Sequence, residues 1–217
     1  MTIKVFLADD HALVSEGLRL ILEKQKDIEV VGVAADGREA VRRVRELHPD
    51  VAILDIAMPE MNGVEAARHL AEHCPRTRTL ILSMHSTSEH ISRALSAGAC
   101  GYVLKESAGS EVVAAVRAAS EGKRYLSAKV ADTVFQDYAQ MKRDGGKSSP
   151  IEKLSFRERE VLQLVVEGKS SKQIAEVIHL SPKTVESYRS RLMGKLGVRD
   201  VAGLVKFAIA NGITTEA

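Results

Sequence analysis

Short apolar runs rich in β-branched residues alternate with longer stretches of helical periodicity in the first half of the chain. Such runs occur at residues 3–8, 30–34, 51–54, 79–82 and 99–104. After each run, apolar positions return every three or four residues, as on one face of a helix. Strand–helix repeats predict a parallel sheet, and strands that are apolar throughout indicate helices on both sides. We therefore expect an α/β domain over residues 1–125 with a five-stranded, doubly wound parallel sheet.

The same periodicity identifies the buried faces of the predicted helices and the end of this domain. In the first helix, the apolar positions at helical spacing are Leu13, Gly17, Leu18, Ile21 and Leu22. A further helix is predicted over residues 128–138. Residues 141–150 carry no apolar periodicity, and their Gly-Gly and Ser-Ser-Pro segments are typical of a flexible linker. A connecting helix and a linker are thus expected to span residues 126–150.

The remainder of the chain has the pattern of short helices with well-marked starts. Capping boxes begin at Ser155 and Ser170, and Ser181 precedes a proline at the first position of the next helix. Two helices joined by a tight turn, the second over residues 182–196, are typical of a helix-turn-helix. Residues 151–217 are therefore expected to form a small all-α helix-turn-helix domain.

Composition excludes several classes of protein. Hydrophobic residues make up 45% and charged residues 28% of the 217-residue chain, and no run reaches the length of a membrane span. Two cysteines are too few for a disulfide scaffold or a zinc site. The N-terminus leads directly into a predicted strand without the pattern of a signal peptide. We expect a cytoplasmic protein with no membrane partner.

The net charge of +2 conceals an acidic balance up to residue 138 and a basic balance beyond it. This asymmetry suggests two modules with different partners, although differences of this size also arise by chance.

Polar side chains with a shared chemistry follow four of the five predicted strands. They are Asp9 and Asp10, Asp55, Ser83 and Lys105. The carboxyl ends of parallel strands meet at one edge of a sheet, so these groups should lie close together. Crowded carboxylates favour a small divalent cation, and Mg²⁺ suits carboxylate, phosphate and water ligands. The sequence therefore predicts a Mg²⁺ site at this edge.

The same set of residues suits phosphoryl chemistry. Lys105 would supply positive charge and Ser83 a hydroxyl to a phosphoryl group. Asp55 follows the third strand, which should be central, and a carboxylate there can act as a nucleophile that forms an acyl phosphate. Each residue alone also fits an ordinary solvated or capping role. Their joint placement after four strands favours a functional site.

These residues lie in segments that resemble the receiver domain of two-component response regulators. The segments are Asp9-Asp10-His11, residues 54–63, residues 82–84 and residues 101–105. The resemblance implies a flavodoxin-like receiver in which Asp55 accepts a phosphoryl group from a sensor histidine kinase. It implies a Mg²⁺ site formed by Asp9, Asp10, Asp55 and the backbone carbonyl of Ala57.

The resemblance also implies which residues respond to the phosphoryl group. Ser83 and Lys105 would contact it, and Tyr102 would rotate inward, although an aromatic residue on a terminal strand is also often only packed. Ala57 and His85 would tune hydrolysis of the acyl phosphate.

The predicted recognition helix separates apolar from polar positions. Val185, Leu192 and Leu196 form an apolar stripe that should pack on the preceding helices. The opposite face is either the DNA-binding surface or an ordinary solvated face. Candidate contacts to phosphates and base edges are Lys183, Thr184, Glu186, Ser187, Arg189, Ser190, Arg191 and Lys195.

Residues 154–162, 172–175, 181–185 and 195–198 resemble the LuxR-type domain of NarL/FixJ regulators. Tyr188, where this family often has histidine, and Gly194, which weakens the helix, are departures from the pattern. The resemblance implies that the last helix, over residues 201–210, dimerises on DNA. Its apolar positions fit that role or an internal core equally well: Val201, Leu204, Val205 and Ala208.

The favoured hypothesis is a DNA-binding response regulator that is phosphorylated at Asp55, dimerises on activation and binds double-stranded DNA. One alternative is an enzyme, a Mg²⁺-dependent phosphatase or phosphotransferase with Asp55 as nucleophile. Ala57 and the lack of a cap domain argue against it. The other alternative is a phosphorylation-independent regulator with a vestigial receiver, against which the complete set of polar residues argues.

Overall fold

A computed structural model describes residues 2–144, 150–211 and 213 of the chain. The chain divides into two compact units between Gly145 and Gly146. Part of the predicted linker, residues 145–149, lies outside the described residues. Among the helices that the structure describes, none has both the length and the apolar character needed to cross a membrane.

The first unit is a parallel sheet of six strands in the order β2-β1-β3-β4-β5-β6. The strands are β1 (Ile3–Ala8), β2 (Ile28–Ala34), β3 (Val51–Asp55), β4 (Arg78–Ser83), β5 (Gly101–Leu104) and β6 (Tyr125–Leu126). The five predicted strands are confirmed. The sixth, which pairs with β5 at the edge of the sheet, was not predicted, because its two residues are too few to show a period.

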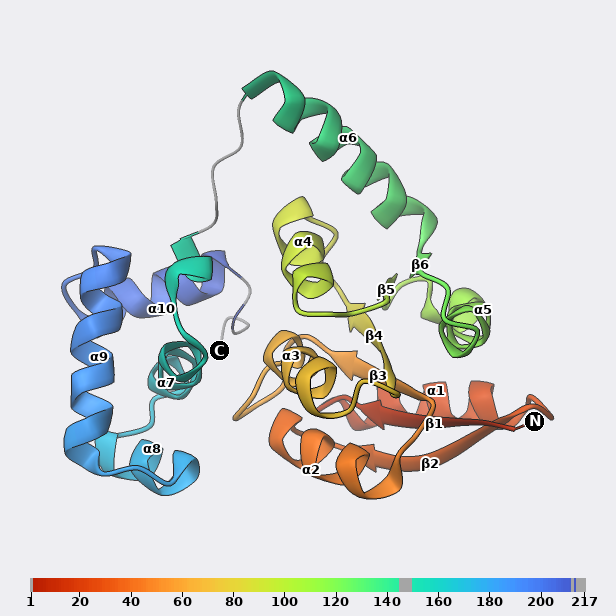
Figure 1. Ribbon diagram of the computed structural model, residues 1–217, viewed down its shortest axis with the longest axis horizontal. Coiled ribbons are helices and arrows are strands. Elements are labelled where there is room, and N and C mark those ends of the chain that lie inside the picture. The colour runs from red at the N-terminus through yellow and green to blue at the C-terminus, as the bar shows by residue number, and fades with distance from the viewer. Residues whose placement is uncertain (1, 145–149, 212, 214–217) are drawn as a thin grey trace. The chain divides into compact units, whose positions relative to one another are not determined.

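Helices cover both faces of this sheet (Figure 1). They are α1 (Ala12–Glu23), α2 (Gly37–Leu47), α3 (Gly63–His73), α4 (Ser88–Ser96), α5 (Ala108–Ser120) and α6 (Ala128–Asp144). The central strand β3 is buried along its whole length, and its alternate residues Val51 and Ile53 join Leu22 of α1 and Val116 of α5 in one core cluster. The predicted doubly covered sheet is therefore confirmed.

Two predictions for the helices of the first unit are wrong. Leu13 is not buried with Leu18 and Leu22: it is 87% exposed, because the nine residues from Leu13 to Leu22 span about two and a half helical turns and place the two leucines on opposite sides of α1. The helix α6 continues to Asp144 instead of ending near residue 138. Its added residues include alanine, glutamine, methionine, lysine and arginine, which are all good helix formers.

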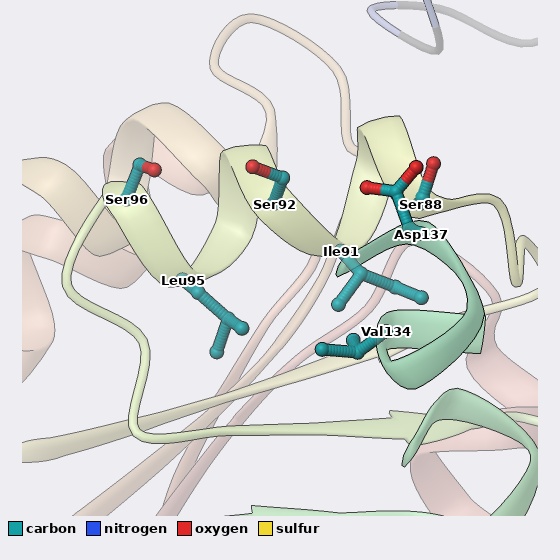
Figure 2. A pocket seen from close by; sticks show the side chains of 7 residues that line it. All are labelled: Ser88, Ile91, Ser92, Leu95, Ser96, Val134 and Asp137. Atoms are coloured by element: carbon teal, nitrogen blue, oxygen red, sulfur yellow. The ribbon is translucent and has the colours of Figure 1, made fainter. Parts of the chain in front are cut away.

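Helix α6 packs against α4 and leaves a hollow of about 350 Å³ between them. Figure 2 shows Ile91, Leu95 and Val134 pointing into this hollow, with Ser92 and Asp137 also among its lining residues. The aliphatic side chains make this contact apolar, so α6 is held to α4 by burial of hydrocarbon surface.

The second unit is all helical, as predicted. A 3₁₀ turn (Pro150–Lys153) precedes α7 (Phe156–Val166), α8 (Ser171–Ile178), α9 (Pro182–Leu196) and α10 (Val201–Ala210). Both capping boxes are formed, and the Ser181 hydroxyl accepts a hydrogen bond from the Thr184 amide at the start of α9. Helix α9 ends at Gly197, whose φ of 67° is a conformation that favours glycine. The apolar faces of all four helices meet in one core.

Candidate functional site

The carboxyl edge of the sheet brings the predicted polar residues together. Asp9 and Asp10 follow β1, Asp55 ends β3 and Lys105 follows β5. The ligand atoms of Asp9, Asp10, His11 and Asp55 all lie within 4.8 Å of one another. The Lys105 ammonium is 2.8 Å from Asp9 Oδ2 and 3.0 Å from Asp55 Oδ2. One cation thus lies between two buried carboxylates.

Burial and crowding perturb the charges in this cluster. Burial, together with the nearby charge of Asp9, raises the pKa of Asp55 to about 6, although Lys105 acts in the opposite direction. Burial alone would lower the pKa of Lys105, but its contacts with Asp9 and Asp55 outweigh burial and raise it. Lys105 is therefore a fixed positive charge, while Asp55 is ionised at neutral pH at a cost in free energy.

The donor set of the cluster fits a hard divalent cation. Asp9 Oδ2 and Asp55 Oδ2 are buried and accept no hydrogen bond within the described part of the chain, although Lys105 lies near both. Their lone pairs are available to a metal ion, and carboxylate oxygens are ligands that Mg²⁺ prefers. The acidic cluster is therefore typical of a Mg²⁺ site.

The loop between β3 and α3 shapes the pocket next to Asp55. It contains the half-buried Ala57 and returns at Gly63, whose amide donates to the Ile56 carbonyl at 2.9 Å. A Cβ atom at Gly63 would lie 2.0 Å from the Asp55 carbonyl oxygen, so no other residue fits there without movement. Gly63 was not among the predicted site residues. The only sequence feature that pointed to it was its place in the segment after Asp55.

Ser83, Tyr102 and His85 meet at the end of β4. The Ser83 hydroxyl accepts a hydrogen bond from the His85 amide at 3.0 Å, and the Tyr102 hydroxyl donates to the His85 carbonyl at 2.7 Å. The Tyr102 ring is fully buried, and burial raises the pKa of its hydroxyl to about 12. Tyr102 thus lies inward, bonded to the loop that follows Ser83.

The recognition helix α9 presents the predicted polar face. Val185 and Leu192 are buried in the core of the second unit, and Leu196 is half-buried against it. Thr184 and Arg189 are half-buried as well. The exposed candidates for DNA contacts are Lys183, Glu186, Ser187, Ser190, Arg191 and Lys195.

Some of these candidates already have partners within the unit. The Lys195 ammonium is 2.7 Å from the buried carboxylate of Glu158 in α7, and Arg189 donates to the Ser171 hydroxyl at 3.0 Å. Burial alone would raise the pKa of Glu158, but hydrogen bonds from Lys195 and from Ser155 outweigh the effect of burial, so the pKa is lowered. Lys195 therefore also links α9 to α7, a role that the exposed face of the helix did not indicate.

The four apolar candidates for dimerisation in α10 divide into two pairs. Leu204 and Ala208 are fully buried in the core of their own unit. Val201 is 39% exposed and Val205 is half-buried. The core interpretation thus suits the first pair, whereas the second pair keeps part of its surface exposed.

The fold and the site together define a class: a receiver-like sheet with an acidic pocket and a lysine, followed by a helix-turn-helix unit. The family model described as "Response regulator receiver domain" matches residues 5–117. The model described as "Bacterial regulatory proteins, luxR family" matches residues 152–208. The chain belongs to the NarL/FixJ family of two-component response regulators, which are DNA-binding transcription regulators rather than enzymes.

Relatives and solved structures agree along nearly the whole chain. "Oxygen regulatory protein NreC" of Staphylococcus epidermidis is 39% identical over 210 residues, which cover 95% of this chain and 96% of that protein. "Transcriptional regulatory protein DegU" of Brevibacillus brevis is 35% identical, with 97% and 94% covered. The Salmonella typhimurium RcsB response regulator has a TM-score of 0.66 at 27% identity, with 98% of each chain covered. A structure of an RcsB–DNA complex has a TM-score of 0.59 at 28% identity, with 95% of this chain and 98% of that chain covered.

Proposed function

We propose that Asp55 accepts a phosphoryl group from a sensor histidine kinase in a pocket that holds Mg²⁺. The observation that carries this proposal is the position of Lys105 between Asp9 and Asp55, within a cluster of oxygen ligands. Asp9, Asp10, Asp55 and the backbone carbonyl of Ala57 would hold the ion. When bound, Mg²⁺ supplies positive charge that offsets the negative charge of the phosphoryl oxygens.

The chain's own residues supply the nucleophile and its surroundings. With a pKa of about 6, Asp55 is largely ionised at neutral pH and can attack phosphorus directly. The new bond joins an Asp55 carboxylate oxygen to phosphorus, and the bond from phosphorus to the kinase histidine nitrogen breaks. The electron pair of the broken bond stays on that nitrogen. Lys105, already beside Asp55, then pairs with the added negative charge.

The phosphoryl group would act on the adjacent loop. It brings about −1.5 to −2 charges and three acceptor oxygens, which attract the Ser83 hydroxyl and Lys105. The Ser83 hydroxyl is hydrogen-bonded to the His85 amide, and the Tyr102 hydroxyl is hydrogen-bonded to the His85 carbonyl. A shift of Ser83 would therefore move the loop that leads into α4. Helix α4 packs on α6, the last element of the first unit (Figure 2). These contacts connect Ser83 with α6, the last helix of the first unit. Ala57 and His85 would tune how long the signal lasts.

Regulation would follow from DNA binding by α9 in the major groove. Lys183 and Arg191 are exposed and suited to phosphates, with Lys195 and Arg189 nearby as further donors. Glu186, Ser187, Ser190 and Thr184 would contact base edges. RcsB, which is 28% identical to this chain, has a solved complex with DNA, and this supports a DNA-binding role.

One helix-turn-helix contacts few bases, so a homodimer on two half-sites suits specific recognition. We infer that the exposed Val201 and the half-buried Val205 contribute to that dimer. A regulator that receives its signal from a kinase and acts on DNA would operate in the cytoplasm.

Treating the full chain with acetyl phosphate and Mg²⁺ tests the proposal. Intact-mass measurement should show one added phosphoryl group, which is absent after Asp55→Asn substitution or when the metal is chelated. The proposal is overturned if the wild-type chain stays unmodified or if the Asp55→Asn variant is labelled to the same extent. If Asp55→Asn regulates transcription normally, the vestigial-receiver alternative is correct.

A further inference from the structure

Two stacked histidines lie in the segment that joins β4 to α4. The ring centroids of His85 and His90 are 4.8 Å apart, and the ring planes are inclined by 17°. His85 is exposed, whereas His90 lies in the first turns of α4 and is 8% exposed. The Thr87 hydroxyl is 2.6 Å from His90 Nδ1. The His90 ring thus contacts the Thr87 hydroxyl through Nδ1 and stacks on the His85 ring.

The backbone of His85 contacts two of the proposed switch residues. Its amide donates to the Ser83 hydroxyl at 3.0 Å, and its carbonyl accepts from the Tyr102 hydroxyl at 2.7 Å. The amide belongs to the peptide group before His85 and the carbonyl to the one after it, so a displacement of the His85 Cα atom changes both contacts together. The position of His85 therefore affects one of the two contacts of the inward Tyr102 hydroxyl, the other being with the Ser83 side chain.

His90 is an unusual choice for a purely apolar packing position. Its Nε2 atom is buried and has no hydrogen-bond partner among the described residues. An unpaired buried nitrogen costs free energy that a leucine or phenylalanine would not. Burial, together with the charges of His85 and Arg93, lowers the pKa of His90 to about 4, so the ring that supports His85 is neutral.

We propose that His90 is a positioning residue of the receiver switch, whose ring holds the backbone of His85 where it binds the inward Tyr102 hydroxyl. This inference rests on the proposed function, in which Ser83 and Tyr102 respond to the phosphoryl group. It predicts that the aromatic ring at position 90, rather than the volume of the side chain, controls the response of Tyr102.

The test uses the full chain labelled with 3-fluorotyrosine and observed by ¹⁹F NMR. The chain has four tyrosines, and the Tyr102 signal is assigned by its loss in Tyr102→Phe. Beryllofluoride with Mg²⁺ serves as the phosphoryl mimic. In the His90→Leu variant, loss of an aromatic pair should raise the beryllofluoride concentration for half-maximal change of this signal by roughly two- to tenfold. His90→Phe, which restores a ring, should return it close to the wild-type value.

A second stacked pair provides the matched control. His69 and His73 of α3 stack with ring centroids 5.5 Å apart, and the His73 ring nitrogen Nδ1 lies 3.0 Å from the His69 carbonyl oxygen within the same helix. His73→Leu should leave the Tyr102 titration unchanged. Thr87→Val, which keeps the buried ring, should shift the titration in the same direction as His90→Leu but by a smaller factor. If His90→Leu does not fold, the Thr87→Val variant shows whether His90 is a positioning residue.

The outcomes separate this inference from the proposed function. If wild-type Tyr102 responds to beryllofluoride and His90→Leu responds identically, His90 is not a positioning residue and the proposed function stands. The inference is also wrong if His90→Phe fails to restore a response lost in His90→Leu. If the wild-type Tyr102 signal does not respond at all, the proposed switch itself is wrong.

Discussion

Replacing Asp55 by asparagine should stabilise the first unit at neutral and alkaline pH in the absence of Mg²⁺. Asp55 is buried beside Asp9, and its pKa is raised to about 6 even though Lys105 lies 3.0 Å away. Keeping this carboxylate ionised in the folded protein therefore costs free energy. An amide of the same shape carries no charge and removes that cost.

The size of the effect follows from the pKa. The difference between about 6 in the folded chain and the ordinary value of 3.8 corresponds to about 3 kcal/mol at about 1.4 kcal/mol for each pKa unit. The folded pKa is raised, so the wild-type protein bears the full cost above pH 6. The cost falls as the pH drops from 6 toward 3.8, where the folded carboxyl is protonated and the unfolded one is still ionised. The advantage of Asp55→Asn should therefore shrink over that range.

Denaturant unfolding followed by hydrogen-exchange mass spectrometry measures this change. Peptides from β1 and β3 report on the first unit alone, which matters because a chain of two units need not unfold in one step. Asp10→Asn is the matched control: it removes a charge from the same cluster, but the Asp10 side chain is one-third exposed and should give a smaller gain. Mg²⁺ should stabilise the wild type more than Asp55→Asn. Equal or lower stability of Asp55→Asn at pH 8 without Mg²⁺ would refute the reasoning.

Three further predictions concern surfaces and cores. Leu13 is exposed three residues after Asp10, so Leu13→Ser should slow phosphotransfer from the kinase but not from acetyl phosphate, as measured by intact mass. Lys183→Ala should weaken DNA binding equally for all sequences and reduce the slope of the logarithm of affinity against the logarithm of salt concentration by roughly 0.9. Lys195→Ala should also lower the melting temperature of the second unit, because Lys195 pairs with a buried carboxylate. Leu204→Ala should destabilise the second unit by roughly 2–5 kcal/mol in denaturant unfolding, whereas Val201→Ser should leave its stability unchanged and reduce dimerisation on DNA in sedimentation experiments. Wild-type stability of Leu204→Ala would contradict the assignment of Leu204 to the core. Unfolding of Val201→Ser would contradict the assignment of Val201 to the exposed face of α10.

The elements of the fold could be predicted because their patterns are local. Apolar strands, helical periodicity and capping boxes such as those at Ser155 and Ser170 each depend on a few neighbouring residues. The strand ends also indicated which side chains would converge, since parallel strands share one carboxyl edge. Strand β6 was not predicted because two residues carry no period, and Leu13 was misplaced because it lies about two and a half helical turns from Leu22, on the opposite side of α1.

The finer features of the sites depend on contacts between distant segments. The pairing of Lys195 with Glu158 joins residues 37 positions apart, and nothing in either helix alone indicates it. The backbone approach that requires Gly63 becomes visible only when the loop is folded against Asp55. The support of His85 by His90 similarly requires the turn into α4. Residue types locate the chemistry, while packing determines which of them act together.

Selection from a randomised duplex pool tests most directly whether phosphorylation at Asp55 controls DNA binding. The full chain is presented with the pool at fixed salt, with Mg²⁺ and beryllofluoride and without them, and the affinity for the enriched sequences is then measured. The account predicts selective binding to two-fold related half-sites that tightens when the mimic is present. Selective binding with the same affinity in both conditions would show that phosphorylation at Asp55 does not control DNA binding and would contradict the account.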